Sequence, residues 1–464
     1  MVFACLLAAV GLPAAAAAGE RMWVGFQDDP SFRWRDDRAH MLDRARDHNA
    51  SVLRTTVYWS RIAPTRPSSP ANPFDPTYRF DDLDEFVRGA WGRGMAVMLT
   101  IWGTPGWANG GRGQNYAPGN PGDLTAFARA LASRYSGRNA GLPFVQFYTV
   151  WNESNLEQFL APTFDSRGRP LAPYTYARIY RAAHAGIKAG NPKALVGIGE
   201  TSPRGRDRPT PAPGRLQNSM SPGRFAQALS TVRPRLQFDA WSHHPYSNLG
   251  LGPVQRVRFP NVSLTQLPQF ERKLDEWFGR RNIPMWITEY GFETKPGEPK
   301  GVTPAQQAAY MRQTFAIAED DPRVQMLIWF IFRDDPTSTW QSGLLLHSDK
   351  EKPASNIFAP LARIVDARNP IVSAKAGQFP SVRVPVFELA FRNGLAAPVF
   401  TTTRVYNGTR LVGVSQPTGS IAIDGWVSLL VPVKTRKGVT YTVTFDMADQ
   451  HGTRVFRIAT IVTR

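Results

Sequence analysis

Two glutamates stand at the ends of short apolar segments in distant parts of this chain. Glu153 follows the segment VQFYTVWN, and Glu289 ends the segment PMWITE. Both segments are rich in β-branched and aromatic residues, which is typical of buried strands. Two carboxyls at the strand ends of one closed sheet project into the same cleft. There, one carboxyl can donate a proton while the other attacks an electrophilic carbon.

Other strand-like segments also end in polar or flat aromatic side chains. Arg54 lies within SVLRTTVYW, and the segment FDAWSH runs into His244 and Tyr246. Flat rings pack on the faces of sugars, exclude water and help to keep one carboxyl protonated. Two carboxyls flanked by such rings can cleave a glycosidic bond. The aromatic residues at these strand ends are Tyr58, Trp59, Trp102, Trp107, Tyr246 and Trp329.

The elements that must position these side chains alternate regularly between Met22 and about Asp366. Eight short apolar segments are separated by segments of helical periodicity, which favours a (β/α)8 barrel with enlarged loops. The alternative is a doubly wound open sheet, but no Gly-rich phosphate loop follows the first strand. A barrel places its chemistry at the carboxyl ends of the strands. We expect helices to begin near Trp34, Phe80, Asp123, Tyr174, Thr265, Thr303 and Pro353.

The pattern changes after Pro370 to short alternating segments. Examples are VRVPVFELAF, FTTTRVY, WVSLLVPV and TYTVTFDM, and no helical pattern is visible. Asn407-Gly408 between two such segments predicts a hairpin, and Gln450-His451-Gly452 predicts another turn. The predicted fold is therefore a barrel over residues 20–368, followed by a small all-β sandwich over residues 369–464.

With these features together, the chain resembles the retaining glycoside hydrolases of clan A. These are (β/α)8 barrels whose acid/base and nucleophile are glutamates ending the fourth and seventh strands. The resemblance is carried by Asn152-Glu153, by Glu289 in WITEYG and by Lys352-Pro353-Ala354 after the last strand. Within the clan the chain is most similar to family 39 and to cellulase-like family 5. Its C-terminal segment resembles the immunoglobulin-like sandwiches that often follow such barrels.

The resemblance implies a role for each matching residue. Glu153 is then the general acid and later the general base, and Glu289 is the nucleophile that forms a covalent glycosyl-enzyme. Arg54 holds Glu289 ionised through its positive charge. Asn152 bonds the sugar hydroxyl next to the anomeric carbon, and Trp329 lies under the sugar at the cleavage point.

Four further residues are predicted to bind substrate. Tyr246 or His244 would contact the nucleophile or the sugar. His244 is preferred to His243 because neighbours on a strand point to opposite faces, and a buried, hydrogen-bonded ring is expected for His243. Trp59 and Trp107 are candidate sugar platforms, with packing at the top of the barrel as the alternative.

Other carboxylates and one loop allow two interpretations. Glu200, at the end of the fifth strand, and Glu293 can line sugar subsites or be ordinary loop carboxylates. Asp28 and Asp29 end the first strand, where a polar residue can bind substrate. The loop TSPRGRDRPTPAPGRLQNSM after the fifth strand is a surface loop or a basic lip that recognises an acidic glycan.

Composition and charge exclude several classes of protein. Of the 464 residues 42% are hydrophobic, which excludes wholesale disorder, and the one cysteine excludes a disulfide scaffold. The seven histidines are scattered and no phosphate loop or Ser-His-Asp elbow is visible, so we expect no metal and no cofactor. The net charge of +18 is spread over a large surface or attracts an acidic polymer. A nucleic acid is not expected, because the basic residues do not cluster.

The first residues predict export. Residues 1–19 are apolar and end in small residues, as in a secretory signal peptide, although no Lys or Arg precedes them. This segment is too short and too rich in alanine to span a membrane well, and we therefore expect no stable membrane insertion. The sequence thus predicts a secreted retaining glycoside hydrolase acting on an oligo- or polysaccharide. The alternatives are a non-catalytic carbohydrate-binding or cell-surface protein on the same barrel, and a transglycosylase.

Overall fold

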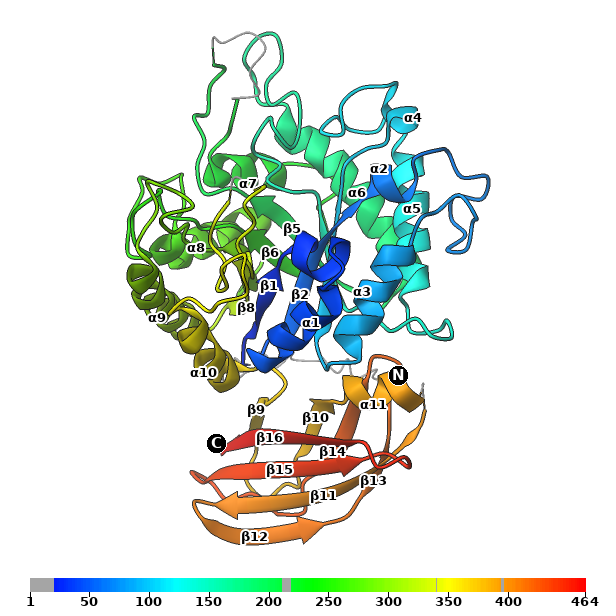
Figure 1. The fold of residues 1–464 in the computed structure, drawn as a ribbon, viewed down its shortest axis with the longest axis vertical. Helices are drawn as coiled ribbons and strands as arrows, with labels where there is room; N and C mark the ends of the chain where they lie inside the picture. The colour runs from blue at the N-terminus through cyan, green and yellow to red at the C-terminus, as the bar shows by residue number, and fades with distance from the viewer. Residues whose placement is uncertain (1–20, 211–217, 339, 394–395) are drawn as a thin grey trace, which may run out of the picture.

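Eight parallel strands close into a barrel in the computed structural model, which describes residues 21–210, 218–338, 340–393 and 396–464 (Figure 1). Each strand pairs with the next along the chain, and β8 returns to β1, where Phe26 lies beside Trp329. The predicted barrel is therefore confirmed. Its strands are β1 (Trp23–Gln27), β2 (Val52–Tyr58), β3 (Ala96–Trp102), β4 (Phe147–Val150), β5 (Leu195–Thr201), β6 (Ala240–His243), β7 (Met285–Tyr290) and β8 (Val324–Phe330). The predicted signal peptide, residues 1–19, lies outside the described residues.

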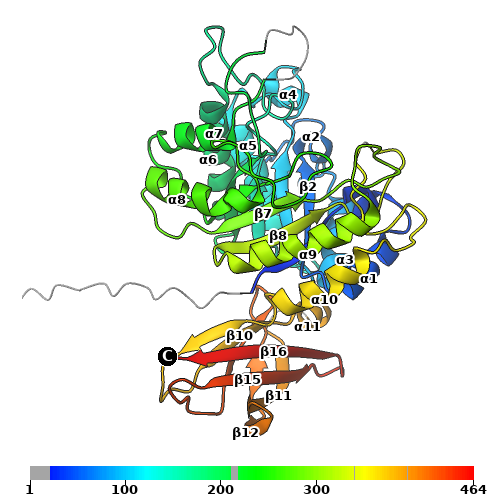
Figure 2. The same cartoon turned by 90° about the vertical axis from the view of Figure 1, so that its left-hand side faces the viewer.

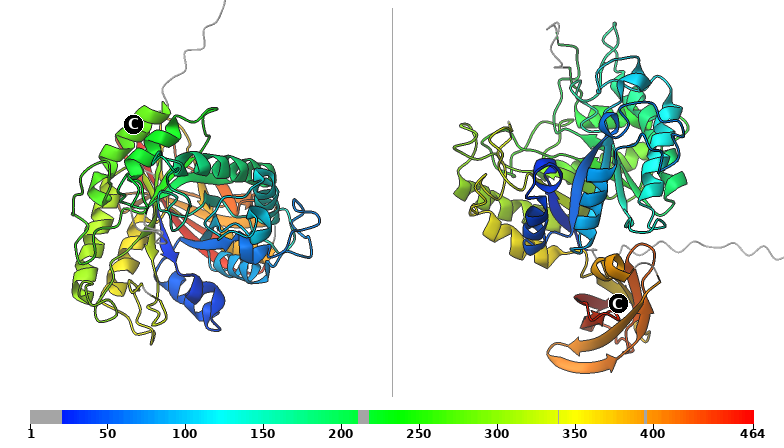
Figure 3. Two further views of the ribbon diagram at one scale, coloured as in Figure 1. Left: turned by 90° about the horizontal axis from the view of Figure 1, so that it is seen from above. Right: turned by 45° about the vertical axis from the view of Figure 1, so that its right-hand side comes forward.

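Helices cover the outside of the barrel (Figure 3). All seven predicted helices are present. The sequence missed α7, which is short and follows a Pro- and Arg-rich loop, and the four-residue helices α2 and α4. No helix among the described ranges is long and apolar enough to cross a membrane. The helices are η1 (Pro30–Trp34), α1 (Arg38–Asp47), α2 (Trp59–Ile62), α3 (Asp81–Trp91), α4 (Gly106–Asn109), α5 (Pro121–Arg134), α6 (Ala172–Gly190), α7 (Pro222–Ser230), η2 (Leu264–Gln266), α8 (Leu267–Phe278), α9 (Pro304–Asp320) and α10 (Ser355–Val365).

The start of α9 shows how local sequence sets these boundaries. The side chain of Thr303 accepts a hydrogen bond from the Gln306 N–H at 3.2 Å, and the Gln306 side chain accepts one from the Thr303 N–H at 2.8 Å. Pro304 occupies the first turn, where no N–H is needed. This capping box satisfies backbone donors that a helix start leaves without partners.

Near the carboxyl end of the barrel, its interior contains a buried cluster of polar side chains, Arg54, Thr100 and Thr149. Every residue of β2 and β3 but the last is buried, as expected for parallel strands covered on both faces. Within this core Arg54 Nε donates to Thr100 Oγ1 at 2.9 Å, and Thr100 Oγ1 lies 2.7 Å from Thr149 Oγ1. A buried guanidinium requires such partners, and they fix its orientation.

The C-terminal part consists of two sheets, as expected for a sandwich, whereas the finer immunoglobulin-like assignment stays a prediction. One sheet pairs β10 with β14, and the other has the order β12-β11-β15-β16-β9, with β13 also on β11. Asn407-Gly408 joins β11 to β12, and Gln450–Gly452 joins β15 to β16, as predicted. The strands are β9 (Ile371–Ala374), β10 (Ser381–Pro385), β11 (Pro398–Asn407), β12 (Arg410–Ser415), β13 (Thr418–Ser420), β14 (Trp426–Leu430), β15 (Thr440–Ala448) and β16 (Arg454–Thr463).

One expectation for this part was wrong. The segment VRVPVFELAF was predicted as a strand, but it forms β10 and then a helix, α11 (Phe387–Asn393). Pro385 ends the strand pairing, because proline has no N–H to donate. Glu, Leu and Ala after it are good helix formers, and Phe387 and Ala390 are buried on one side of the helix.

An aromatic cluster joins α11 to the amino-terminal end of the barrel. The ring centroids of Trp91 and Phe387 lie 4.8 Å apart, those of Phe387 and Trp426 6.1 Å apart, and those of Trp23 and Trp426 6.3 Å apart. Trp23 begins β1, so the β-sheet part lies below the barrel, at the end opposite the strand carboxyl termini (Figures 1 and 2). The C-terminal part therefore packs against the base of the barrel.

We predict that Phe387→Ala destabilises the protein by about 3–5 kcal/mol, because it removes a ring packed between two tryptophans and leaves a cavity. Phe456→Ala is the matched control, since its ring is 55% exposed on β16. Denaturant unfolding of both variants measures the difference. Equal losses of stability in the two variants would contradict the role of the aromatic cluster.

Candidate active site

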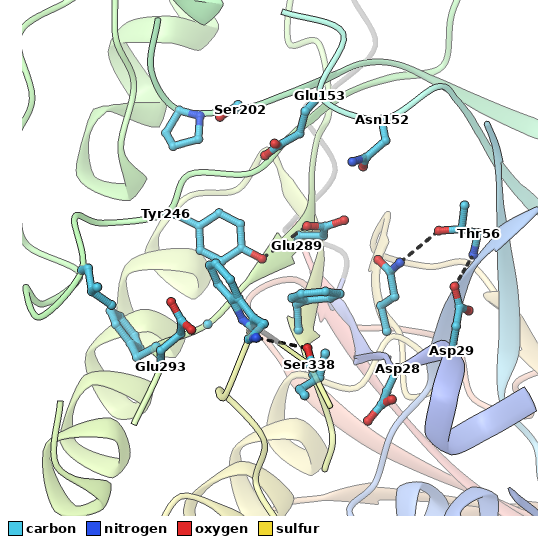
Figure 4. A pocket seen from close by; sticks show the side chains of 18 of the residues that line it. Asp28, Asp29, Thr56, Asn152, Glu153, Ser202, Tyr246, Glu289, Glu293 and Ser338 are labelled. Carbon is cyan, nitrogen blue, oxygen red and sulfur yellow. Dashed lines mark hydrogen bonds between the residues drawn. The ribbon is translucent and has the colours of Figure 1, made fainter. Parts of the chain in front are cut away.

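A cavity of about 730 Å³ opens at the carboxyl end of the barrel (Figure 4). Both predicted catalytic glutamates line it: Glu289 is the penultimate residue of β7, and Glu153 follows β4 by three residues. Trp151 and Glu153 have φ angles of +72° and +36°, so the chain turns sharply after β4. The turn directs the Glu153 carboxylate back over the space that Glu289 faces.

One histidine connects the two glutamates. His244 Nδ1 lies 3.1 Å from Glu153 Oε1 and 3.5 Å from Glu289 Oε2. Its other nitrogen, Nε2, lies 3.0 Å from Glu200 Oε2, which is fully buried below the cavity. Because carboxylates on both sides accept hydrogen bonds, the ring is arranged to donate from both nitrogens.

The charges around His244 favour its protonated form. Burial lowers the pKa of His244, but Glu289, Glu153 and Glu200 outweigh burial and raise the pKa to about 10. Conversely, burial raises the pKa of Glu200, and Arg54 and His244 together lower it below its ordinary value. The site therefore holds an imidazolium cation between carboxylates.

Arg54 provides a second buried cation. Its Nη1 donates to Glu289 Oε1 at 2.6 Å, and its Nη2 donates to Glu200 Oε2 at 2.8 Å and to Asn152 Oδ1 at 3.3 Å. Nη1 also contacts Gln27. The arginine is fully buried, so water does not weaken these contacts. Arg54 thereby sets the positions of the nucleophile candidate and of Asn152 together.

The remaining predicted polar contacts also meet in the cavity. Tyr246 Oη donates a hydrogen bond to Glu289 Oε2 at 3.3 Å, and its ring stacks on Tyr290 with centroids 5.9 Å apart. Burial, followed by the charges of Glu289 and Glu153, raises the pKa of Tyr246 well above 10, so its hydroxyl stays a donor. Asn152 lines the cavity beside Glu153.

Three predicted sugar platforms do not face the cavity. Trp329 is fully buried, and its indole N–H donates to the Ser342 carbonyl at 2.9 Å; its predicted place under the sugar is therefore wrong. Side chains alternate along β8, and the next residue, Phe330, faces the cavity instead. Trp59 is fully buried against Phe127, with ring centroids 5.5 Å apart.

Trp107 belongs to the same packing above the barrel wall. Its ring stands edge-on to Trp59 at 5.7 Å, its N–H donates to the Ala63 carbonyl at 2.8 Å, and the guanidinium of Arg66 covers it at 4.5 Å. Of the two interpretations of Trp59 and Trp107, packing is the one that the structure supports. The flat side chains that do line the cavity are Trp34, Tyr58, Trp102, Phe159, Tyr246, Phe292, Phe330 and Trp340.

Glu200 and Glu293, which the sequence allowed as subsite residues or as loop carboxylates, differ in their surroundings. Glu200 is neither a loop carboxylate nor part of the cavity wall; it is the buried partner of Arg54 and His244. Glu293 lines the cavity, and burial raises its pKa to about 7. Asp28 and Asp29 also line the cavity, but each accepts backbone hydrogen bonds.

His243 is the buried, hydrogen-bonded histidine that the sequence predicted. Its Nδ1 lies 2.8 Å from Thr201 Oγ1 and its Nε2 lies 3.2 Å from the Val262 carbonyl. Burial lowers its pKa to about 3, so this ring is neutral beside the charged His244. Within the described ranges no three His, Cys, Asp or Glu residues are grouped so that they could hold a metal ion.

A closed barrel with two glutamates at the ends of β4 and β7 defines a glycoside hydrolase of the clan A type. A sequence model named "Cellulase (glycosyl hydrolase family 5)" matches residues 16–331, more than half of the chain. The chain belongs to glycosyl hydrolase family 5. The resemblance to clan A that the sequence indicated is thus confirmed, and the protein is a carbohydrate-degrading hydrolase.

Solved structures share the same fold. A family 39 glycoside hydrolase from the gut symbiont Bacteroides cellulosilyticus WH2 is 16% identical, over 93% of this chain and 81% of that one, with a TM-score of 0.54. A glucosidase from Croceicoccus marinus is 12% identical, over 90% and 94% of the two chains, with a TM-score of 0.55. At these identities the likeness concerns the fold alone. A search of curated proteins found no match.

We predict that Glu200→Gln lowers the pKa of His244 from about 10, because one of the three carboxylates that raise this pKa is lost. An NMR titration of isotope-labelled histidine measures the change. Glu293→Gln is the control, since it removes another carboxyl from the same region without a contact to His244. An unchanged His244 pKa in Glu200→Gln would contradict the proposed charge balance.

The same pair of variants tests stability against pH. The folded-state pKa of His244 lies above its unfolded value of about 6.5, so its protonation stabilises the fold fully below that pH. This stabilisation is lost as the pH rises through about 10. In Glu200→Gln the folded-state pKa is lower, so we expect its fall in melting temperature above pH 6.5 to be smaller and to end at a lower pH than in Glu293→Gln.

Proposed function

We propose that this chain is a secreted, retaining glycoside hydrolase that cleaves O-glycosidic bonds of an oligo- or polysaccharide by double displacement. The proposal is carried by one observation: Glu153 and Glu289 both lie close to Nδ1 of His244. Glu153 Oε1 lies 3.1 Å and Glu289 Oε2 lies 3.5 Å from His244 Nδ1, so the two carboxylates meet in the same part of the cavity. Retaining enzymes hold such a pair about 5–5.5 Å apart, and the clan A enzymes that the chain resembles are retaining.

Each half-reaction assigns one task to each glutamate. The carboxylate of Glu289 attacks the anomeric carbon, while Glu153 gives its proton to the departing glycosidic oxygen. The products are a free sugar hydroxyl and a glycosyl ester of Glu289. Glu153, now ionised, takes a proton from a water that attacks the anomeric carbon and releases Glu289. Both steps invert the carbon, so the overall configuration is retained.

The neighbouring residues support these tasks by charge and position. The guanidinium of Arg54 compensates the charge of Glu289 and orients it together with the Tyr246 hydroxyl. Asn152 is positioned by Arg54 to bond a sugar hydroxyl beside the anomeric carbon. When Glu153 carries the proton, the Nδ1–H of His244 can turn toward Glu289.

Secretion is a separate part of the proposal and rests on the apolar, small-residue pattern of residues 1–19. A non-catalytic carbohydrate-binding or cell-surface protein is disfavoured, because both carboxylates and the cations that orient them are intact. A transglycosylase passes through the same glycosyl ester. Product analysis with an added sugar acceptor distinguishes transfer from hydrolysis.

We predict that Glu289→Gln abolishes both turnover and covalent labelling by an activated 2-deoxy-2-fluoro glycoside, because the amide cannot form the glycosyl ester. Mass spectrometry of the labelled wild type should place the sugar on Glu289. Glu276→Gln, an exposed change on α8, should label like the wild type. Labelling that persists in Glu289→Gln would exclude this residue as the nucleophile.

For Glu153→Gln we predict a loss of about 100-fold or more on natural linkages, because the leaving oxygen needs a proton. A dinitrophenyl glycoside has a leaving group that needs none, so its first step should be much less affected. The values of kcat/KM on both kinds of substrate measure the contrast, because they report the first step alone. Equal losses on both would show that Glu153 is not the general acid.

A further inference from the structure

Among the residues that the structure describes, one cation in the wall of the cavity has no carboxylate partner. Arg204, in the loop after β5, lines the same cavity as Glu153 and Glu289. Its Nη2 donates to the Tyr246 carbonyl at 2.9 Å, and its buried Nε has no hydrogen-bond partner among the described residues. Burial lowers the pKa of Arg204, but an arginine stays charged in proteins. A half-buried, uncompensated guanidinium is costly unless an anion completes it.

The other charged side chains of the cavity are already paired or occupied. Asp335 forms an ion pair with Arg35 at 2.7 Å, and Asp28 and Asp29 accept backbone hydrogen bonds. Glu293, with a pKa of about 7, is partly protonated at neutral pH. Within the described ranges no carboxylate forms an ion pair with Arg204, so its terminal Nη groups are left for a ligand.

The backbone holds Arg204 in place. The residues on both sides of it are fixed, because the Pro203 carbonyl accepts from the Val262 N–H at 2.9 Å and the Gly205 N–H donates to Asn261 at 2.9 Å. A Cβ on Gly205 would lie 1.9 Å from the Met220 carbonyl carbon, so the chain packs tightly there. The guanidinium is thus a preorganised part of the wall rather than a free surface cation.

The next residues of the loop extend the positive charge outward. Arg206 and Arg208 are exposed, and neither forms an ion pair within the described part of the chain. Asp207 between them accepts from Ser221 and lies 3.5 Å from Arg224, so it does not neutralise them. Together with the net charge of +18, this arrangement attracts anionic chains toward the cavity.

We propose that Arg204 binds the carboxylate of a uronic acid, so that the substrate of this cavity is an acidic glycan. The planar guanidinium pairs with a planar carboxylate through two parallel hydrogen bonds, and a neutral hydroxymethyl group offers no such pair. The inference rests on the proposed function, because it names the substrate class for the same cavity. It assigns to Arg204 a specificity role that none of the catalytic steps requires.

Binding to an inactive protein tests the proposal apart from catalysis. The Glu289→Gln variant is titrated by calorimetry with two matched pairs of β-1,4-linked tetrasaccharides. These are cellotetraose with its glucuronic acid counterpart, and mannotetraose with its mannuronic acid counterpart. We expect at least one acidic member to bind about tenfold or more tightly than its neutral partner, because a charge-assisted pair is stronger than a hydrogen bond between neutral groups.

Two double variants locate the preference. Adding Arg204→Gln to Glu289→Gln should remove it, and adding Arg204→Lys should restore it in part, because the charge returns without the planar fork. Arg410→Gln is the control, since it deletes one positive charge on β12, far from the cavity. Melting temperatures show that each variant is folded.

Each outcome of these titrations either supports or overturns the binding of a uronic acid by Arg204. It is overturned if neither acidic tetrasaccharide is preferred, or if the preference survives in Arg204→Gln. A preference that Arg410→Gln weakens equally, and that salt removes, indicates non-specific attraction and also overturns it. The proposed function fails independently if the wild type hydrolyses no glycoside and the fluorosugar labels nothing, while the binding preference can still stand.

Discussion

The buried guanidinium of Arg54 is the interaction on which the active site depends. It lies at the centre of the barrel with no exposed surface and donates to Glu289, Glu200 and Asn152. A charge in that position is stable only because two carboxylates and several neutral oxygens surround it. The same contacts fix the nucleophile candidate, so the group that makes the charge tolerable also aligns the chemistry.

Glu200 links this cation to a second one. Its Oε2 accepts from Arg54 at 2.8 Å and from His244 at 3.0 Å, and the other nitrogen of His244 lies near both candidate catalytic glutamates. The site thus alternates negative and positive groups from the barrel interior to the cavity. Such an alternating network couples the protonation of each member to that of its neighbours.

The two ends of the barrel differ in what they bind: the amino-terminal end packs against the C-terminal sheets, and the carboxyl-terminal end forms the cavity. At the amino-terminal end, aromatic rings from β1, α3, α11 and β14 attach the C-terminal sheets. At the carboxyl-terminal end, the strand ends and loops line the cavity with flat aromatic rings and with Arg204. The rings can cover any sugar, whereas one uncompensated cation selects among sugars by charge.

The sequence by itself determined the barrel and the strand-end positions of the two glutamates, His244 and Tyr246, because strand periodicity and strand-end position are local properties that eight repeats make unambiguous. It did not determine which face each residue takes. Trp329 and Phe330 differ by one position, and only the register of β8 on β1 decides that the phenylalanine faces the cavity. Glu200 likewise required the closed sheet, since its partners Arg54 and His244 come from distant strands. Local sequence patterns predict the element in which a side chain lies, whereas the packing of distant elements decides which residues it contacts.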